Sequence, residues 1–325
     1  MRMKKIQSST NSFNMPILKV GLIGNGYFGK NYRRLLSETD GVELRAIANN
    51  KQEAKKIFKN PEIDCLIISS PPSTHFALAK DGILEGKHVL VEKPMTISLR
   101  DARELEKLVQ KSDKIFMVGH QYLYNDHISE LKEKLDNGIL GKIHYVFAEH
   151  FYFGPLRRDI GVFWDAVPHM LSIADYLFSP FEIKKVKGTM VVFEGSEHDD
   201  FVSAQINTKS NILLSVAVSR FAFPKTRKII FGGSLGVAVY DELEPENKLK
   251  FVNHPYPPES FKKSSLFLTP KNNEILMPKV KAREPLFNQL NHFLNCVRQD
   301  CLPLSDIKHG IRIIKMLDLI EKKIV

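Results

Sequence analysis

Short apolar runs alternate with amphipathic stretches along the first 120 residues. Five runs are mainly apolar and are predicted to be strands: 18–23, 42–48, 64–69, 87–91 and 114–119. The third is nearly all apolar, as a strand buried on both faces of a sheet should be. Four stretches between them carry apolar residues at helical spacing: 27–36, 51–58, 73–84 and 98–110. This alternation predicts an α/β fold with a doubly wound parallel Rossmann sheet and right-handed crossovers.

The pattern changes after residue 119. A helix is predicted at 125–137, a loop running into a helix at 157–177, and two closing helices at 285–298 and 307–324. Between them lie alternating, aromatic and β-branched runs typical of strands: 142–153, 183–193, 200–208, 211–219, 227–232 and 235–240. Hairpin turns are expected at 207–211 and 232–236, and an irregular segment at 253–285. We therefore predict a C-terminal α/β domain with a large, mostly antiparallel open sheet.

The length of 325 residues exceeds the usual size of one domain. We expect a flexible leader at 1–16, a Rossmann dinucleotide-binding domain at 17–121, and a domain for substrate binding and oligomerisation at 122–325. The chain has no apolar run long enough to span a bilayer, and its N-terminus lacks the apolar block of a signal peptide. A cytoplasmic protein without a membrane partner is expected. The three cysteines have neither a disulfide framework nor a metal-binding spacing, so reduced thiols and no metal are predicted.

The formal net charge is +10. Basic residues are spread along the chain and mixed with acids, which argues against a nucleic-acid partner. A positive field also favours an anionic small molecule.

The first strand is followed by Gly24, Gly26 and Gly29, with the spacing G-x-G-x-x-G. The first glycine permits a tight turn, the second lets the backbone approach a pyrophosphate, and the third lets helix and strand pack closely. Tyr27 and Phe28 complete this turn, where the helix N-terminus faces an anion. The alternative is a plain strand-to-helix turn without a ligand.

An acid about 20 residues beyond such glycines usually binds the ribose hydroxyls. Asn49 occupies that position, followed by Asn50 and Lys51. Asparagine still hydrogen-bonds a ribose, and the missing carboxylate with a nearby lysine removes the repulsion of a 2′-phosphate. The cofactor is therefore predicted as NAD or NADP. The alternative for Asn49, Asn50 and Lys51 is that they only begin the next helix.

The third strand ends at Ser70 and Pro71, at the edge of a parallel sheet where ligands bind. His75 in the following helix is predicted to lie beside the cofactor or, as the alternative, to cap or pack only. The fourth strand ends in Glu92 and Lys93, stopped by a proline, and we expect this charged pair to point into the cleft. The alternative is a surface ion pair at a turn.

Asp165 and His169 are four residues apart, so a helix starting near Asp165 places both on one face. Pro168 fits such a start because proline is tolerated in a first helical turn. Histidine suits proton transfer near neutral pH, and lysine suits stabilisation of a developing alkoxide. The alternative is an N-cap and a packed histidine.

Together these motifs resemble the glucose–fructose oxidoreductase / inositol dehydrogenase / rhizopine-catabolism (Gfo/Idh/MocA) family over residues 17–323. The resemblance rests on the glycine turn, Ser70 and Pro71 with His75, the block 86–94, Asp165 with His169, and the segment 303–310. It implies NAD(P)-dependent oxidation or reduction of a sugar or polyol CH–OH group, and an open sheet that often serves homodimers or homotetramers.

By the same resemblance, Lys93 binds the nicotinamide ribose and the reacting hydroxyl, His169 is the acid/base, and Asp165 assists it. The segments 119–125 and 158–169 look similar to bacterial branches that act on nucleotide-linked sugars for surface polysaccharide biosynthesis. That implies substrate contacts at Tyr124, Asn125, Arg158 and Trp164. Ser172 departs from the family because many members carry a second acid there. The alternatives are a dehydrogenase of a free polyol or aldose, and a non-catalytic cofactor-binding sensor or scaffold.

Overall fold

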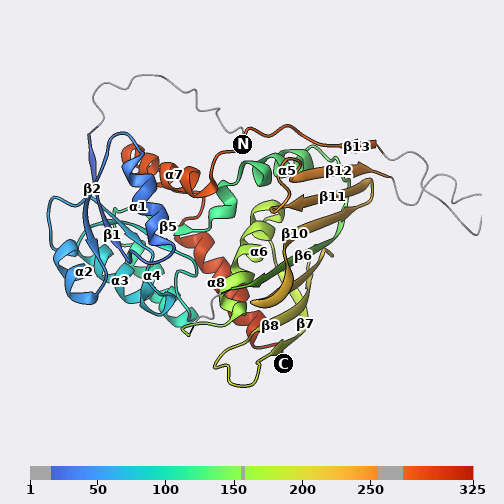
Figure 1. Ribbon diagram of the computed structural model, residues 1–325, viewed down its shortest axis with the longest axis horizontal. Coiled ribbons are helices and arrows are strands. Elements are labelled where there is room, and N and C mark those ends of the chain that lie inside the picture. Colours follow the sequence, from blue (N-terminus) through green and yellow to red (C-terminus); the bar gives the residue numbers. More distant parts are fainter. Residues whose placement is uncertain (1–15, 155–157, 255–273, 325) are drawn as a thin grey trace, which may run out of the picture.

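A five-stranded parallel sheet forms the N-terminal part of the protein, in a computed structural model that describes residues 16–154, 158–254 and 274–324. Its strand order is β2-β1-β3-β4-β5. The strands are β1 (Leu18–Ile23), β2 (Val42–Ala48), β3 (Cys65–Ile68), β4 (His88–Glu92) and β5 (Phe116–Gly119). The Rossmann sheet predicted from the apolar runs is confirmed (Figure 1). The predicted leader at 1–16 lies, except for residue 16, outside the described residues.

Each strand of this sheet contributes to two cores, because successive side chains point to opposite faces. In β3, Cys65 and Ile67 pack with helix α1 (Gly29–Ser37), whereas Leu66 and Ile68 pack on the other face. That second face is covered by three helices: α2 (Lys51–Phe58), α3 (Pro72–Leu84) and α4 (Leu99–Val109). Burial on both faces explains why β3 and β5 consist of apolar residues and glycine.

The second sheet has eight strands in the order β13-β12-β11-β10-β6-β9-β8-β7. The strands are β6 (Ile143–Phe153), β7 (Ile183–Val191), β8 (Phe201–Thr208), β9 (Leu213–Ser219), β10 (Phe221–Gly233), β11 (Gly236–Asp241), β12 (Leu249–Asn253) and β13 (Glu274–Leu276). Neighbours are antiparallel except for β6 and β9, so the predicted architecture holds. The irregular segment expected at 253–285 contains β13, and β12 had no counterpart in the predicted strands; residues 255–273 lie outside the described residues.

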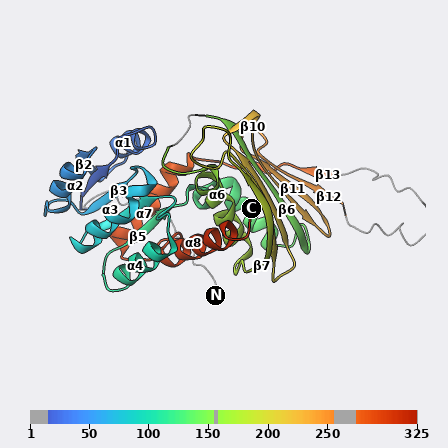
Figure 2. The same ribbon diagram turned by 90° about the horizontal axis from the view of Figure 1, so that it is seen from below.

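Two helices join the parts of the molecule (Figure 2). Helix α6 (Val162–Phe178) lies between the large sheet and the first domain, beside helix α5 (Asp126–Asp136). Helix α8 (Ile307–Glu321) contacts both α4 and α6, and its Gly310 lies against Met95 and Val118. The contacts of α8 fix the position of α6 relative to the ends of the parallel strands.

Helix α7 (Pro285–Gln299) returns to the first domain and packs beside α1 (Figure 1). Its Leu290 and Phe293 are buried in the same core as Leu18 and Tyr32. Among the described residues, no helix has the length and apolar character needed to cross a membrane.

Candidate active site

The three glycines after β1 have the stereochemistry of a pyrophosphate-binding turn. Gly24 has φ +90°, a conformation that favours glycine, and a Cβ there would lie 2.6 Å from the backbone N of Ser70. A Cβ at Gly29 would lie 1.9 Å from the Gly24 carbonyl oxygen, so helix α1 approaches the strand as only glycine permits. A Cβ at Gly26 would meet nothing within 4 Å. The open space at Gly26 fits the group that the sequence predicts there, a dinucleotide pyrophosphate. Of the two residues between the glycines, Tyr27 is exposed and Phe28 packs its ring on Tyr32.

The polar residues after β2 hold this turn and begin α2. The Asn25 N–H donates to Oδ1 of Asn49 at 3.1 Å, which ties the glycine turn to the end of β2. Asn50 is the N-cap of α2 and accepts from the N–H groups of Gln52 and Glu53. Lys51 is exposed at the first turn of α2. The alternative prediction, that these residues begin the next helix, is thus correct for Asn50 and Lys51, while Asn49 holds the glycine turn; a ribose contact of Asn49 or Lys51 stays a prediction.

His75 connects the ends of β3 and β4. It is buried, with one ring nitrogen 2.8 Å from the Ser70 carbonyl oxygen and the other 2.8 Å from the Pro94 carbonyl oxygen. Pro71 is the N-cap residue of α3. His75 therefore holds the loop that carries Ser70 and Pro71 against the loop that follows Lys93.

Glu92 does not point into the cleft as the sequence predicted. Its carboxylate is buried between β4, α1 and α7, where it accepts from the Tyr32 hydroxyl at 2.5 Å and lies 3.4 Å from Nε2 of Gln289. Burial raises the pKa of Glu92, partly offset by these hydrogen bonds and by Lys93. The side chain is drawn inward because α7, distant in sequence, supplies a partner there.

Lys93 does point into the space between the two domains. Its ammonium donates to Oδ1 of Asp165 at 2.9 Å and to the Asp165 backbone oxygen at 2.6 Å. The Tyr152 hydroxyl of β6 donates to Oδ2 of the same carboxylate at 3.0 Å. Lys93 and Asp165, two of the three predicted catalytic residues, are therefore in contact across 72 positions of the chain.

Helix α6 begins at Val162, not near Asp165, so Pro168 lies inside the helix. Proline has no N–H for the carbonyl of Trp164, four residues earlier, and its ring crowds that turn. A residue distant in the sequence stabilises the first turn of the helix: the Phe163 N–H donates to Oδ2 of Asp199 at 2.6 Å. The sequence could not reveal this because Asp199 lies 36 residues further along the chain.

His169 follows Asp165 by one helical turn and is buried except for 8% of its surface. Burial, reinforced by the charge of Lys93, holds the pKa of His169 well below its usual value, so the ring is neutral at pH 7. Its Nδ1 has no hydrogen-bond partner among the described residues. Ser172, where a second acid was expected from the family, donates to the His169 backbone oxygen at 2.8 Å.

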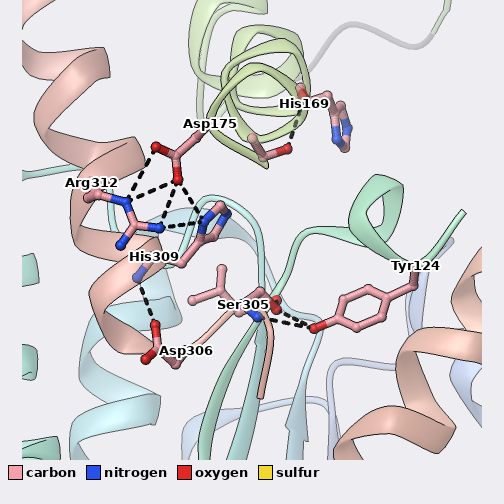
Figure 3. Close-up of polar contacts among 9 residues, drawn as sticks. Tyr124, His169, Asp175, Ser305, Asp306, His309 and Arg312 are labelled. Carbon is pink, nitrogen blue, oxygen red and sulfur yellow. Dashed lines mark hydrogen bonds and ion pairs between the residues drawn. The ribbon is translucent and has the colours of Figure 1, made fainter. Parts of the chain in front are cut away.

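Figure 3 shows His169 on α6 with its ring directed away from a polar cluster that includes the buried Asp175 of the same helix. In that cluster, Asp175 accepts from Arg312 at 2.8 Å and lies 3.2 Å from Nδ1 of His309. Both partners belong to α8. The cluster therefore joins α6 to α8 and fixes the helix that carries Asp165 and His169.

Three of the four predicted substrate contacts have hydrogen-bond partners within the protein. Tyr124 is buried in the first domain, where its hydroxyl lies 2.7 Å from Oγ of Ser305, away from His169 (Figure 3). Asn125 caps α5 and donates to the Tyr240 hydroxyl at 2.9 Å. The indole N–H of Trp164 donates to Glu321 at 2.7 Å, at the bottom of a groove of about 690 Å³ between α4 and α8. Arg158 is exposed ahead of α6.

Four residues beside His169 were missed by the sequence analysis. The ring of Tyr122, in the 3-10 helix η1 (Gln121–Tyr124), lies 5.0 Å from that of His169. The His150 ring of β6 is parallel to it at 6.2 Å. Arg227 of β10 donates to Glu242 at 2.6 Å, and Tyr122 donates to the other oxygen of Glu242. One signal was present for His150: it shares the strand face of the buried residues Val146 and Ala148.

Comparison with known proteins agrees with the fold and the glycine turn. The model of an oxidoreductase family with an NAD-binding Rossmann fold matches residues 18–120, and that of the GFO/IDH/MocA C-terminal domain matches residues 128–239. An uncharacterised oxidoreductase of Escherichia coli strain K12, YdgJ, is 31% identical over 259 residues, which are 72% of this chain and 74% of that protein.

Two solved structures share the whole architecture. UDP-N-acetylglucosamine 3-dehydrogenase GnnA from Acidithiobacillus ferrooxidans superposes with a TM-score of 0.78, over 95% of this chain and 98% of that one, at 20% identity. A levoglucosan dehydrogenase in complex with NADH superposes with a TM-score of 0.79, over 94% and 96%, at 17% identity.

Fold, glycine turn and family models together define an oxidoreductase with a Rossmann domain for a nicotinamide dinucleotide, NAD or NADP. The chain belongs to the GFO/IDH/MocA family of oxidoreductases.

Proposed function

We propose that this protein transfers a hydride between a nicotinamide dinucleotide and a CH–OH or keto carbon of a sugar. The observation that carries the proposal is the contact of Lys93 with Asp165, one helical turn before His169. It gathers a cation, a carboxylate and a neutral imidazole at the end of β4, the edge where such sheets bind their ligands. A non-catalytic scaffold has no use for a partly buried cation held in this way.

The residues divide the work of proton transfer and charge stabilisation. A bound nicotinamide supplies a hydride acceptor or donor. His169, neutral because of its burial, takes the hydroxyl proton during oxidation and returns it during reduction. Lys93 stabilises negative charge that develops on the carbinol oxygen. Asp165 holds the Lys93 ammonium, and Tyr152 holds Asp165. This assignment needs no acid at position 172.

The nucleotide-linked sugar expected from the sequence remains our proposed substrate class. Support comes from cations near the site, since the charges of Arg227 and Lys225 act on His150. Such cations favour a diphosphate outside the sugar subsite. Similarity to GnnA in fold fits this class, and similarity to levoglucosan dehydrogenase favours the alternative, a free sugar or polyol. A role in surface polysaccharide biosynthesis and a homo-oligomeric state remain predictions.

The test is turnover of a panel of sugars with and without a nucleotide group, followed by the absorbance of the reduced nicotinamide with NAD⁺ and with NADP⁺. Lys93→Met and His169→Ala are expected to lose at least about 100-fold in kcat, since acid–base and electrostatic groups each contribute about 10²–10⁴-fold. Cofactor affinity, measured by calorimetry, should change less than about threefold.

Lys80→Met is the matched control, because Lys80 makes a comparable 2.7 Å ion pair with Glu104 on the outside of the first domain. It should leave kcat unchanged. Normal turnover by both Lys93→Met and His169→Ala would show that the proposed roles are wrong.

A further inference from the structure

Strand β6 and helix α6 meet in register beside the Lys93 ammonium. On β6, Tyr152 contacts Asp165 of α6. Two residues before Tyr152, the ring of His150 lies parallel to that of His169, which follows Asp165 by four residues on α6. Two residues of a strand span about 6.6 Å, and one helical turn rises about 5.4 Å. Because these lengths are similar, the Tyr152–Asp165 and His150–His169 contacts can form at the same time. His150 therefore lies beside the imidazole that exchanges the proton.

His150 has a cross-strand partner on β10. In the antiparallel register of β6 and β10, Arg227 lies directly opposite His150. Arg227 donates through Nη1 to Glu242, and Tyr122 donates to the same carboxylate while its ring faces His169. His150, Arg227, Glu242 and Tyr122 thus form one wall of polar groups from the large sheet and η1, which we call the sheet wall.

Three nitrogens in and beside the sheet wall are buried without a hydrogen-bond partner in the part of the chain that the structure describes: Nδ1 of His150, Nδ1 of His169 and Nε of Arg227. Buried polar atoms are almost always paired in folded proteins, and an unpaired one is destabilising. Their concentration at one place shows a polar wall with fewer partners than its groups can bind, and the partly exposed side chains of Arg227 and Glu242 leave it open to a polar ligand group.

The charges define which group that is. Arg227 is paired with Glu242 and Lys93 with Asp165, and burial keeps both imidazoles neutral, with a pKa of about 3 for His150. A carboxylate or phosphate at the sheet wall would meet Glu242 at close range. A neutral hydroxyl suits the wall, because it donates to Glu242 or to an imidazole nitrogen and accepts from the guanidinium of Arg227, whose side chain is 29% exposed.

We propose that His150, Arg227 and Glu242 bind the substrate hydroxyl next to the carbon that exchanges the hydride, so that the substrate is a sugar with an unsubstituted vicinal diol at that carbon. This inference rests on the proposed function and adds the residues that select the substrate. It makes His150, Arg227 and Glu242 specificity-determining residues, while proton transfer stays with His169.

The test uses the sugar that the panel identifies and its deoxy analogue, which lacks the hydroxyl on the neighbouring carbon. The wild type should prefer the complete sugar by at least about 100-fold in kcat/KM, because a site built for a hydroxyl strongly rejects the analogue without it. His150→Gln and Arg227→Lys should reduce this ratio to less than about tenfold by losing activity on the complete sugar alone. Glu242→Gln is a third variant, which decides the question should His150→Gln fail to fold.

His127→Gln is the matched control. His127 is also buried with its pKa lowered by burial, but its ring lies near Tyr240 and contacts none of the catalytic residues. It should keep the wild-type ratio. Absence of turnover of every sugar by the wild type would overturn the proposed function and this inference with it. Wild-type turnover with the same deoxy ratio in all the sheet-wall variants would overturn this inference alone.

Discussion

The Tyr152 hydroxyl lies 3.0 Å from Oδ2 of Asp165, whereas the Lys93 ammonium binds the other carboxylate oxygen, Oδ1. The carboxylate is therefore held from the first domain on one oxygen and from the large sheet on the other. Relative movement of the two domains would break one of these contacts, so Asp165 couples domain position to the geometry of Lys93.

Removing the hydroxyl should consequently impair catalysis without unfolding the protein. A hydrogen bond to a charged group contributes about 1.5–3 kcal/mol, so Tyr152→Phe should lower kcat about tenfold or more. Cofactor affinity should not change. Tyr145→Phe is the control, because Tyr145 lies on the same strand with its side chain exposed. Equal kcat values for the two variants would show that the Tyr152 hydroxyl does not position Asp165.

Substitutions in the glycine turn should affect cofactor affinity and protein stability separately. Gly26→Ala should leave the melting temperature within about 3 °C of the wild type, since its Cβ meets no protein atom within 4 Å, yet reduce dinucleotide affinity at least about tenfold. Gly29→Ala should be destabilising by about 1–3 kcal/mol, because its Cβ would lie 1.9 Å from a backbone oxygen. Calorimetry with NAD⁺ and thermal unfolding measure both effects. Full dinucleotide affinity in Gly26→Ala would place the cofactor elsewhere.

Cofactor preference should depend on Lys51, exposed at the first turn of α2. One exposed cation near a phosphate contributes up to about 1 kcal/mol, or about fivefold in affinity. Lys51→Glu should therefore weaken NADP⁺ binding by about fivefold or more and leave NAD⁺ binding within about twofold. Lys55→Glu, one turn further along the same helix, is the control. Equal losses in both variants would assign the effect to net charge alone.

The buried imidazole of His150 should make stability depend on pH. Burial lowers its pKa from 6.5 to about 3 in the folded protein, whereas the unfolded chain takes up this proton near pH 6.5. The free energy of unfolding therefore falls as the pH decreases from 6.5 towards 3, by about 1.4 kcal/mol per pH unit from this residue. His150→Gln should remove that part of the slope. Urea unfolding of both proteins between pH 5 and 7.5 measures it, and identical slopes would contradict the burial of a neutral imidazole.

The sequence by itself determined most of the local structure. Apolar runs gave β1 to β5 within two residues at each end, because strands buried on both faces cannot carry polar side chains. The glycine spacing located the tight turn between β1 and α1, since Gly24 and Gly29 each meet a steric requirement of that turn. Lys93, Asp165 and His169 were recognisable as a set from their resemblance to a family, and the structure brings the first two into contact.

Tertiary structure alone decided which neighbouring side chains share the cleft. Glu92 turns inward because α7 returns from the end of the chain, and Tyr122 replaces Tyr124 beside His169 because η1 directs them to different cores. His150 meets Arg227 through the register of β6 and β10, which lie 77 positions apart at that pair. Periodicity assigns a residue to a strand face but carries no information about the strand that pairs with it, so the sheet wall could be seen only in the folded chain.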